Sequence, residues 1–487
     1  MAYDLGHGKQ VFIDWQLIEP GYGVRWGGDR PTSWEMPHGL HLAVHPPRID
    51  PQPLVWPDRV WETFINVYCT LFEDEGRFRL YYECHYLREG DEPSDLRAML
   101  AYAESTDGVN WAKPRVGTIS FQGSTDNNLV YALGLSLGRG AHGATVFRDP
   151  SAPPDQRYKL VHMGDEGGKS CVFGAVSPDG LRWTALKQPL ITDYVSDTQT
   201  VMRYDERKGR YVGYFRGWEG MEEADWWGRR AIAYAESERF EGWPKPRILV
   251  TSDIHDNPDT DIYTNAYTPW PDARNAYLLF PAFYQRALDV TEVHLMTSRD
   301  GLHWQRPSRE PLIPSGGPGS GWEGGVYAGC GLVSVRKGEW SLPIGPKRHS
   351  HNQGLFAESK SASIDRGYLC LATWRQDGFT SLEALTEGQC TTAPLTFTGA
   401  RLHLSAWTRF GGEVKVELAA VSGETIAEHS FGDCDLISGD LLDHIVSWRG
   451  NPDLSAWAGK PLRLRLYLRR ARLYALRFVW TTPGGRP

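Results

Sequence analysis

Acidic and imidazole side chains stand at matching places along this chain, each just before a run of residues typical of a β-strand. Carboxyl groups brought close together serve as acid and base in catalysis, and they also bind divalent cations or hydroxyl groups. A strand that only packs in an apolar core needs no charge at its start, so the repeated charges predict a binding or catalytic site. The residues are Glu62, His142, Asp197, Asp261 and Glu323.

A short signature, Ser-x-Asp-Gly-x-x-Trp, indicates how these residues are positioned. It occupies residues 105–111, 177–183 and 298–304, and incomplete copies stand at 238–243 and 377–379. Asp-Gly favours the tight turn of a β-hairpin, because glycine tolerates a positive φ, and the Trp anchors the strand that follows. Two strand-like runs precede each copy, so the chain repeats one β unit five times. Radial repetition of such units predicts a five-bladed β-propeller.

The sequence changes in character after Phe379. Alternating polar and apolar residues in 401–407 and 463–468 favour a β-sandwich, and about a hundred residues suffice for one small domain. We therefore predict an all-β chain, with a five-bladed β-propeller over residues 1–379 followed by a C-terminal β-sandwich over residues 380–487. No long amphipathic helix is expected.

Composition narrows the function. The 487 residues carry a net charge of −8 and no long basic run, which argues against a nucleic-acid partner. No apolar stretch approaches the roughly 20 residues of a membrane helix, and the first residues lack an export segment, so no membrane partner and a cytoplasmic location are expected. Seven cysteines, an odd number, do not indicate a disulfide framework. The 20 Trp and 22 Tyr residues supply flat faces on which sugar rings can stack.

The innermost strand of each propeller blade lines a central channel, and the start of that strand faces the funnel at its mouth. The five charged residues would therefore converge there, and neighbouring polar residues would hold the hydroxyl groups of a sugar. Arg216, which ends a strand of the third unit, would hold a carboxylate or pair with Glu219 instead. Asp14 precedes the first unit and is either structural or an acid of the funnel. The predicted substrate-binding residues are His142, Gln199, Arg216, Asp261, Tyr263, Asn265 and Asp14.

The five units, the Ser-x-Asp-Gly-x-x-Trp hairpins and the trailing sandwich resemble the glycoside hydrolases of families 32 and 43, and the whole chain is similar to a family-32-like bacterial group. The resemblance implies that acids from the first three blades act as nucleophile, transition-state stabiliser and general acid, in that order. The third acid falls on Asp197. The second position falls on His142 and the first lies near Asn66, neither of which is an acid, while Glu62 stands a few residues before Asn66.

These residues together predict a glycoside hydrolase that removes a terminal sugar from an oligosaccharide or glycoside. The chemistry needs one protonated and one ionised carboxyl group across the scissile bond. We assign Asp197 as the general acid and either Glu62 or Glu323 as the base or nucleophile.

Two other classes of function stay open. One is a different sugar enzyme on the same propeller, either a phosphorylase, which needs Arg or His residues in the funnel, or a metal-assisted lyase that uses His142. The other is a carbohydrate-binding propeller without catalysis. The pattern establishes no cofactor, and calcium bound by the funnel acids is the divalent cation that it admits. The sandwich is expected to brace the propeller and to offer a surface for homo-oligomers.

Overall fold

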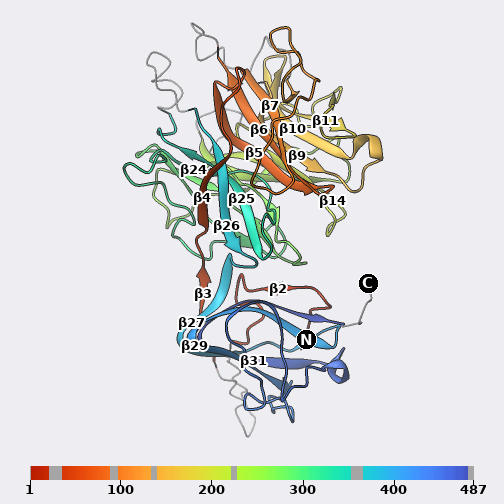
Figure 1. Cartoon of the computed structure of the whole chain (residues 1–487), viewed down its shortest axis with the longest axis vertical. Helices are drawn as coiled ribbons and strands as arrows, with labels where there is room; N and C mark the ends of the chain where they lie inside the picture. The colour runs from red at the N-terminus through yellow and green to blue at the C-terminus, as the bar shows by residue number, and fades with distance from the viewer. Residues whose placement is uncertain are drawn as a thin grey trace.

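β-strands and the turns between them build nearly the whole described chain. The computed structural model describes residues 2–20, 36–87, 97–132, 140–220, 228–352 and 366–480. Within these ranges there is no α-helix, and hence no helix long and apolar enough to cross a membrane. A large β-propeller and a smaller C-terminal β unit lie one above the other (Figure 1). The all-β class and the propeller predicted from the sequence are confirmed.

Each of the first three blades is a separate four-stranded antiparallel sheet whose strands follow one another along the chain. The first contains β5 (Phe64–Asp74), β6 (Arg77–Tyr86), β7 (Arg97–Ser105) and β8 (Leu129–Tyr131). The second contains β9 (His142–Arg148), β10 (Tyr158–Glu166), β11 (Lys169–Ser177) and β12 (Thr184–Ala185). The third contains β13 (Val201–Asp205), β14 (Arg210–Glu219), β15 (Arg229–Ser237) and β16 (Arg247–Val250). Because β9 contacts both β5 and β13, the first strands of these blades line the central channel.

The last two blades are less regular. The fourth contains β18 (Thr268–Pro269), β19 (Tyr277–Leu279), β22 (Met296–Ser298) and β23 (Trp304–Gln305). The fifth is one part of a seven-stranded sheet and contains β24 (Gly325–Ala328), β25 (Glu339–Lys347), β26 (Leu369–Arg375) and β4 (Arg48–Val55). The same sheet continues into β17 (Thr260–Ile262), β20 (Ala282–Gln285) and β21 (Val290–Val293). β4 precedes the first blade in sequence, so its pairing with β26 closes the ring.

The repeated hairpin turns owe their shape to their own side chains. In the first, the carboxylate of Asp107 accepts two backbone N–H groups at 2.8 and 2.7 Å, and the indole of Trp111 donates to the carbonyl of Gly108 at 3.1 Å. Gly108 has a positive φ of 71°, and a Cβ there would lie 2.6 Å from Val335 of the fifth blade. The turn therefore needs glycine both for its conformation and for its close contact with the neighbouring blade.

The C-terminal unit is one hydrogen-bonded sheet of eight strands around an apolar core of its own. Five strands follow the propeller: β27 (Thr380–Thr391), β28 (Leu395–Thr396), β29 (Arg401–Ala420), β30 (Asp440–Ile445) and β31 (Leu462–Val479). The other three come from the start of the chain: β1 (Tyr3–Asp4) pairs with β28, β2 (Gln10–Val11) with β31, and β3 (His41–Val44) with β27. The sheet thus combines both ends of the chain, while the domain division after residue 379 stays a prediction.

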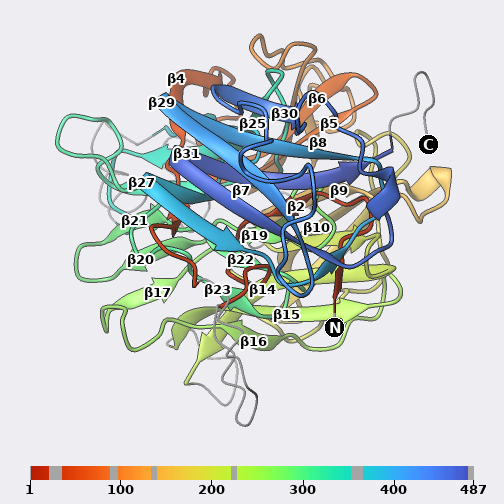
Figure 2. The same ribbon diagram turned by 90° about the horizontal axis from the view of Figure 1, so that it is seen from below.

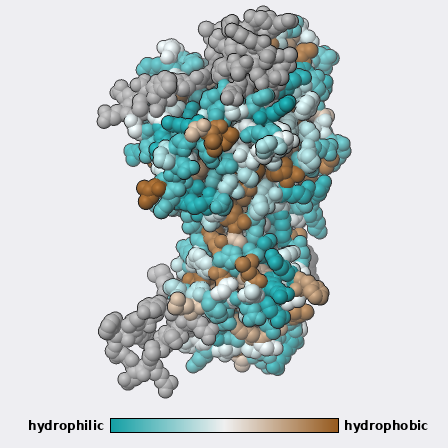
Figure 3. All heavy atoms as spheres, turned by 90° about the vertical axis from the view of Figure 1, so that its left-hand side faces the viewer, coloured by the Kyte–Doolittle hydropathy of each residue, from teal (hydrophilic) through white to brown (hydrophobic). Residues whose placement is uncertain are grey.

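Charged contacts join the two units. The ammonium group of Lys9 lies 3.0 Å from the carboxylate of Asp377, in the turn that follows the fifth blade, and both side chains are buried. Arg375 at the end of β26 donates to Asp440 of β30 at 2.6 Å. Seen from below, β27, β29 and β31 lie across the propeller (Figure 2). The surface turned toward the viewer in Figure 3 is mainly hydrophilic, with apolar side chains gathered near the junction.

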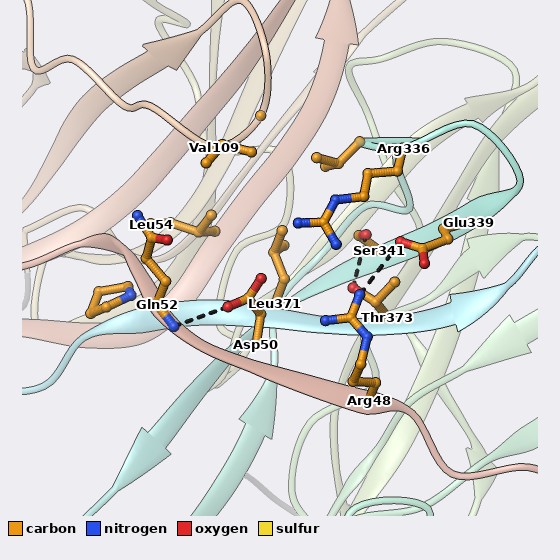
Figure 4. A pocket seen from close by; sticks show the side chains of 13 residues that line it. Arg48, Asp50, Gln52, Leu54, Val109, Arg336, Glu339, Ser341, Leu371 and Thr373 are labelled. Carbon is orange, nitrogen blue, oxygen red and sulfur yellow. Dashed lines mark hydrogen bonds and ion pairs between the residues drawn. The ribbon is translucent and has the colours of Figure 1, made fainter.

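A pocket on the side of the propeller lies where β4 joins the fifth blade (Figure 4). Arg48 of β4 pairs with Glu339 of β25 at 3.5 Å, and Ser341 and Thr373 share a hydrogen bond of 3.1 Å. Glu339 lies opposite Arg375 in the sheet, so the pocket is at the end of the blade that faces the C-terminal unit. Its polar groups bind one another and stabilise the closure of the ring.

Candidate active site

Several of the predicted funnel residues gather at one end of the propeller, and strand directions show that this end faces away from the C-terminal unit, which lies below the propeller in Figure 1. β26 fixes this direction, because its last residue, Arg375, contacts the C-terminal unit and its first, Leu369, lies at the opposite end. The start of β5 is at that opposite end, since the backbone N–H of Ile65 donates to the carbonyl of Arg366 at 2.9 Å. His85, near the end of β6, is there too, because it pairs with the first residue of β5.

A buried carboxylate, Glu83 of β6, is the centre of the polar contacts at this end. Its Oε1 accepts hydrogen bonds from His85 at 2.5 Å, from His142 at 3.0 Å and from the amide of Asn66 at 2.8 Å. Its Oε2 accepts the backbone N–H of Gly143 at 2.7 Å. Burial alone would raise the pKa of Glu83, but the two imidazoles hold that pKa well below its usual range. Glu83 is therefore an ionised anchor to which blades one and two are both attached.

His142, the first residue of β9, links this buried anchor to a more exposed carboxylate. Its Nδ1 faces Glu83, and its Nε2 lies 3.2 Å from Oδ1 of Asp197. Burial would lower the pKa of His142, but the two carboxylates raise it to about 10, so the imidazole is a cation that donates to both at neutral pH. Burial lowers the pKa of His85 instead, so its imidazole is neutral. The ring stacks on Phe64 with the two ring centres 4.4 Å apart.

Asp197 lies on a short segment before β13 that is fixed on both sides. The hydroxyl groups of Ser196 and Thr200 share a hydrogen bond of 2.7 Å, and Ser196 also accepts the backbone N–H of Arg216 at 3.2 Å. The Asp197 side chain is 22% exposed, whereas that of Glu83 is fully buried. Of the three residues in this line, Asp197 is therefore the one that a bound molecule reaches most directly.

Gly143 allows this segment to approach β9. It has a φ of 64°, and a Cβ on it would lie 2.0 Å from the carbonyl oxygen of Thr198, next to Asp197. We expect Gly143→Ala to lower the free energy of unfolding by about 1–3 kcal/mol and to reduce activity, because the clash pushes Asp197 away from His142. Thermal unfolding and turnover, measured together, check both effects.

Gly167, in the hairpin between β10 and β11 of the same blade, is the matched control for this prediction. It also has a positive φ, 60°, but no atom lies within 4 Å of the position of its Cβ. Gly167→Ala should therefore cost only the backbone strain and leave activity unchanged. Equal losses of activity in the two variants would contradict the role given to the Gly143 contact.

The other side of the site is made of arginine and aromatic side chains. Arg216 and Trp218 of β14 and Arg230 of β15 share one face, because Trp218 and Arg230 are paired across the two strands. The guanidinium carbons of Arg216 and Arg230 lie 4.3 and 5.0 Å from the centre of the Tyr263 ring. Arg230 donates at 2.7 Å to Asp261, which is fully buried and also accepts from Arg286. These contacts hold two guanidinium groups against the same aromatic ring.

The structure thus brings five of the predicted residues to the same mouth: His142, Asp197, Arg216, Asp261 and Tyr263. Two others, Gln199 and Asn265, are buried beside them and donate to backbone carbonyls, Gln199 to Cys69 at 2.8 Å and Asn265 to Tyr214 at 3.3 Å. These contacts fix the inner strands of neighbouring blades. Sugar binding by these seven residues stays a prediction.

Glu62 lies on a different face of the first blade. Its carboxylate accepts from Lys113 at 2.7 Å and from the hydroxyl of Tyr82 at 2.6 Å, and the whole side chain is buried. Tyr82 and Glu83 are neighbours on β6, so their side chains point to opposite faces of the sheet. Tyr82 packs with β4 and the fifth blade, whereas Glu83 faces His142 of the second. The structure therefore does not bring Glu62 into contact with Asp197.

Two further predicted residues also lie apart from this cluster. Glu323 stands in the loop before β24, and its carboxylate accepts the backbone N–H of Gly319 within that loop at 2.6 Å. Asp14 pairs at 2.8 Å with Arg299, in the turn between β22 and β23, close to β2 of the C-terminal unit. Among the described contacts, none joins Glu323 or Asp14 to Asp197, and the catalytic role of Glu323 stays a prediction.

Sequence reasoning did not identify Glu83, His85 and Arg230 as site residues. Apart from Arg216 and Asp14, it considered the start of the first strand in each unit, whereas these three lie on the second or third strand of a blade. One signal was present, since Glu83 and His85 are two apart in a strand-like run and so share a face. Neither charge suits a strand that only packs in a core.

The cluster also offers a set of atoms for a metal ion. Glu83, His85 and His142 each place one ligand atom within 4.8 Å of the others. Two imidazoles and one carboxylate suit zinc or another transition metal better than calcium, which prefers oxygen ligands. The same atoms are, however, engaged with one another and with Asn66, so hydrogen bonding alone accounts for their arrangement.

No protein-family model matches the chain, and no curated protein matches it. Among solved structures, a glycoside hydrolase is similar with a TM-score of 0.46 and 14% identity over 68% of this chain and 92% of that one. A glycosyl hydrolase from Bacteroides ovatus has a TM-score of 0.44 and 13% identity over 70% and 96%. A structure described under the glycoside hydrolase family 130 of mannoside phosphorylases has a TM-score of 0.45 and 13% identity over 68% and 94%. These distant likenesses assign neither a family nor a reaction, and the resemblance to families 32 and 43 stays a prediction.

Proposed function

We propose that this protein cleaves glycosidic bonds at the mouth of its propeller and releases a sugar from an oligosaccharide or glycoside by hydrolysis. The observation that supports the proposal best is the line of Glu83, His142 and Asp197. It holds one carboxylate at a partly exposed place, next to the guanidinium and aromatic groups of Arg230 and Tyr263. A charged group so placed, with aromatic rings beside it, suits a sugar ring and the positive charge that develops on that ring during cleavage.

The contact with His142 bears on the role of Asp197. The sequence suggested a general acid, but a carboxyl group that accepts a hydrogen bond from an imidazolium is favoured in its ionised form. We therefore assign to Asp197 the ionised role, as a nucleophile or as the base that activates water. In the overall step the bond between the anomeric carbon and the leaving oxygen breaks, water adds to the carbon, and the leaving oxygen gains a proton. The sequence assigned Glu62 or Glu323 as base or nucleophile; with Asp197 in that role, Glu323 is the candidate donor of the proton, because Glu62 is buried against Lys113 and Tyr82.

Phosphorolysis is the second candidate, because the structure gathers cationic side chains at the site. His142, Arg216 and Arg230 all lie within the site, and such a cluster is what the binding of phosphate needs. In that reaction phosphate, rather than water, would attack the anomeric carbon.

A product assay in oxygen-18 water separates these reactions. We expect a panel of aryl glycosides and oligosaccharides to yield a free sugar that carries one oxygen-18 atom, at a rate that phosphate and chelator leave unchanged. A sugar phosphate would identify a phosphorylase, and an unsaturated sugar a lyase. Loss of activity with chelator, restored by a transition metal, would show that Glu83, His85 and His142 hold a metal. Binding without turnover, seen as a rise in Tm with one sugar, would contradict the enzyme proposal.

Two variants in the same assay test the predicted partners of Asp197. If Glu323 donates the proton, Glu323→Gln should slow the cleavage of substrates with poor leaving groups more than the cleavage of activated aryl glycosides, whose leaving groups need no proton. Glu62→Gln should instead lower the Tm, because it weakens the buried contact with Lys113.

A further inference from the structure

Arg216 is a fully buried cation whose hydrogen bonds are incomplete. Its side chain has no exposed surface, and among the described residues Nη2 alone of its guanidinium nitrogens has a partner, the carbonyl oxygen of Tyr263 at 3.0 Å. Nε and Nη1 find no hydrogen-bond partner in the described parts of the chain. An unpaired buried donor is costly, by about 1–3 kcal/mol and more for a charged group, so such a group is typical of a place that a ligand completes.

Among the described residues, no carboxylate forms an ion pair with the guanidinium of Arg216. Arg230 and Arg286 both bind the same carboxylate, that of Asp261, at 2.7 Å. No ion pair of Arg216 occurs among the described residues, although its guanidinium and that of Arg230 stack on the same ring of Tyr263. One carboxylate, that of Asp261, therefore pairs with two guanidinium groups, and none of the described carboxylates forms an ion pair with the third, that of Arg216.

The guanidinium of Arg216 lies in the same part of the site as Asp197. The backbone of Arg216 binds the hydroxyl of Ser196, the residue before Asp197, at 3.2 Å. Burial is the main cause of the high pKa of the Tyr68 hydroxyl; the charge on Arg216 lowers that pKa and the charge on Asp197 raises it, so Tyr68 lies near both side chains. An anionic group held by Arg216 would thus belong to the same sugar residue that Asp197 contacts.

We propose that Arg216 and Arg230 form a subsite for a carboxylate carried by the substrate, so that the natural substrate is a glycoside of an acidic sugar such as a uronic acid. This inference rests on the proposed glycoside cleavage and names its substrate class. A planar carboxylate accepts paired hydrogen bonds from a guanidinium and, as a single negative charge, balances the charge of Arg216. Phosphate carries more than one negative charge at neutral pH and would repel Asp197 and Glu83.

The test compares matched acidic and neutral aryl glycosides that differ only in a carboxylate at the end of the sugar. We expect kcat/KM to be about 100-fold higher for the acidic member, which corresponds to a charged hydrogen-bonded contact. Arg230→Gln should lower that preference about tenfold or more, mainly through KM, and Arg216→Lys should do the same while keeping the buried charge. The partly exposed Arg230 keeps the test decisive if the Arg216 variant does not fold.

Arg229→Gln is the control, because Arg229 precedes Arg230 on β15, has the opposite orientation and binds Ser252 at 3.1 Å. It should leave the preference unchanged. Equal cleavage of the two glycosides would overturn the subsite and leave the hydrolase proposal intact. If neither is cleaved, a rise in Tm with free uronate but not with the neutral sugar, lost in Arg230→Gln, would support the subsite and contradict the hydrolase. A rise in Tm with phosphate alone would overturn the carboxylate subsite. The same conclusion would follow if uronate, the neutral sugar and phosphate all left the Tm unchanged.

Discussion

Asp197→Asn should reduce turnover by about 10²- to 10⁴-fold, the effect expected when a carboxyl group that acts on the substrate loses its charge. Asparagine has nearly the same shape, and its amide oxygen can still accept the hydrogen bond that Nε2 of His142 donates at 3.2 Å. The side chain is partly exposed, so we expect little change in the free energy of unfolding. Steady-state kinetics on the best substrate of the panel, together with thermal unfolding, measure the two effects separately.

The matched control for this variant is Asp193→Asn. Asp193 stands on the same segment, four residues earlier, and its carboxylate contacts only the exposed Lys169 at 3.1 Å among the described ion pairs. Its variant should keep full activity. If Asp197→Asn also keeps full activity, Asp197 does not act on the substrate, and the roles predicted for Glu323 and Glu62 gain in weight.

Glu83→Ala should destabilise the protein more than any other single change at this site. It removes one carboxylate that serves His85, His142, Asn66 and the backbone of Gly143, all of which would be left without that partner. Breaking a buried ion pair in this way typically costs about 3–5 kcal/mol. Urea unfolding of wild type and variant at one pH gives the difference directly. A loss below about 1 kcal/mol, the range of exposed pairs, would contradict the anchoring role of Glu83.

The same contacts predict how stability changes with pH. The folded state raises the pKa of His142 from its usual 6.5 to about 10, so the contact is fully stabilising below pH 6.5 and its contribution is lost as the pH rises toward 10. The folded state lowers the pKa of Glu83, so its contribution is present above its usual pKa of about 4.5 and is lost at lower pH. Glu83 and His142 together therefore stabilise the fold most between about pH 4.5 and pH 6.5.

His142→Gln separates the two effects. It should remove the decline of stability between about pH 6.5 and pH 10 that wild type shows, because no group of the variant at this place releases a proton there. Urea unfolding across that range provides the test. Parallel declines in wild type and variant would mean that another group causes the alkaline loss.

The parts of the fold that depend on local chemistry could be predicted from the sequence. Asp107 and Gly108 dictate a turn by themselves, and their recurrence indicated the propeller before any strand pairing was known. Pairing between distant segments left no such local signal. Nothing in the sequence indicated that β4 closes the ring or that β1, β2 and β3 pair with the C-terminal sheet.

Only part of the site could be predicted from the sequence, again because local signals could be recognised and contacts between distant segments could not. Asp197 and His142 could be found because a charge at the start of an inner strand is unusual whatever its partners are. Glu62 and Glu83 are both buried acids of the first blade, so residue type does not distinguish them. Glu62 contacts Tyr82 on one face of β6, whereas Glu83 contacts His142 on the opposite face. Arg216 could be noticed in the sequence, but only the structure shows that its Nε and Nη1 find no partner among the described residues.

The pairing of the first strands with the last ones has a consequence for how the protein is made. A chain emerging from the ribosome releases β1 to β4 first, yet β4 needs β26 and the other three need β27, β28 and β31. Four blades can form while these strand edges are still unpaired, and unpaired edges promote incorrect association between nascent chains. Closure of the ring is therefore a long-range event that occurs only after synthesis has passed β26, which ends at Arg375. Chaperones that shield strand edges would act on the N-terminal segment before they act on any blade.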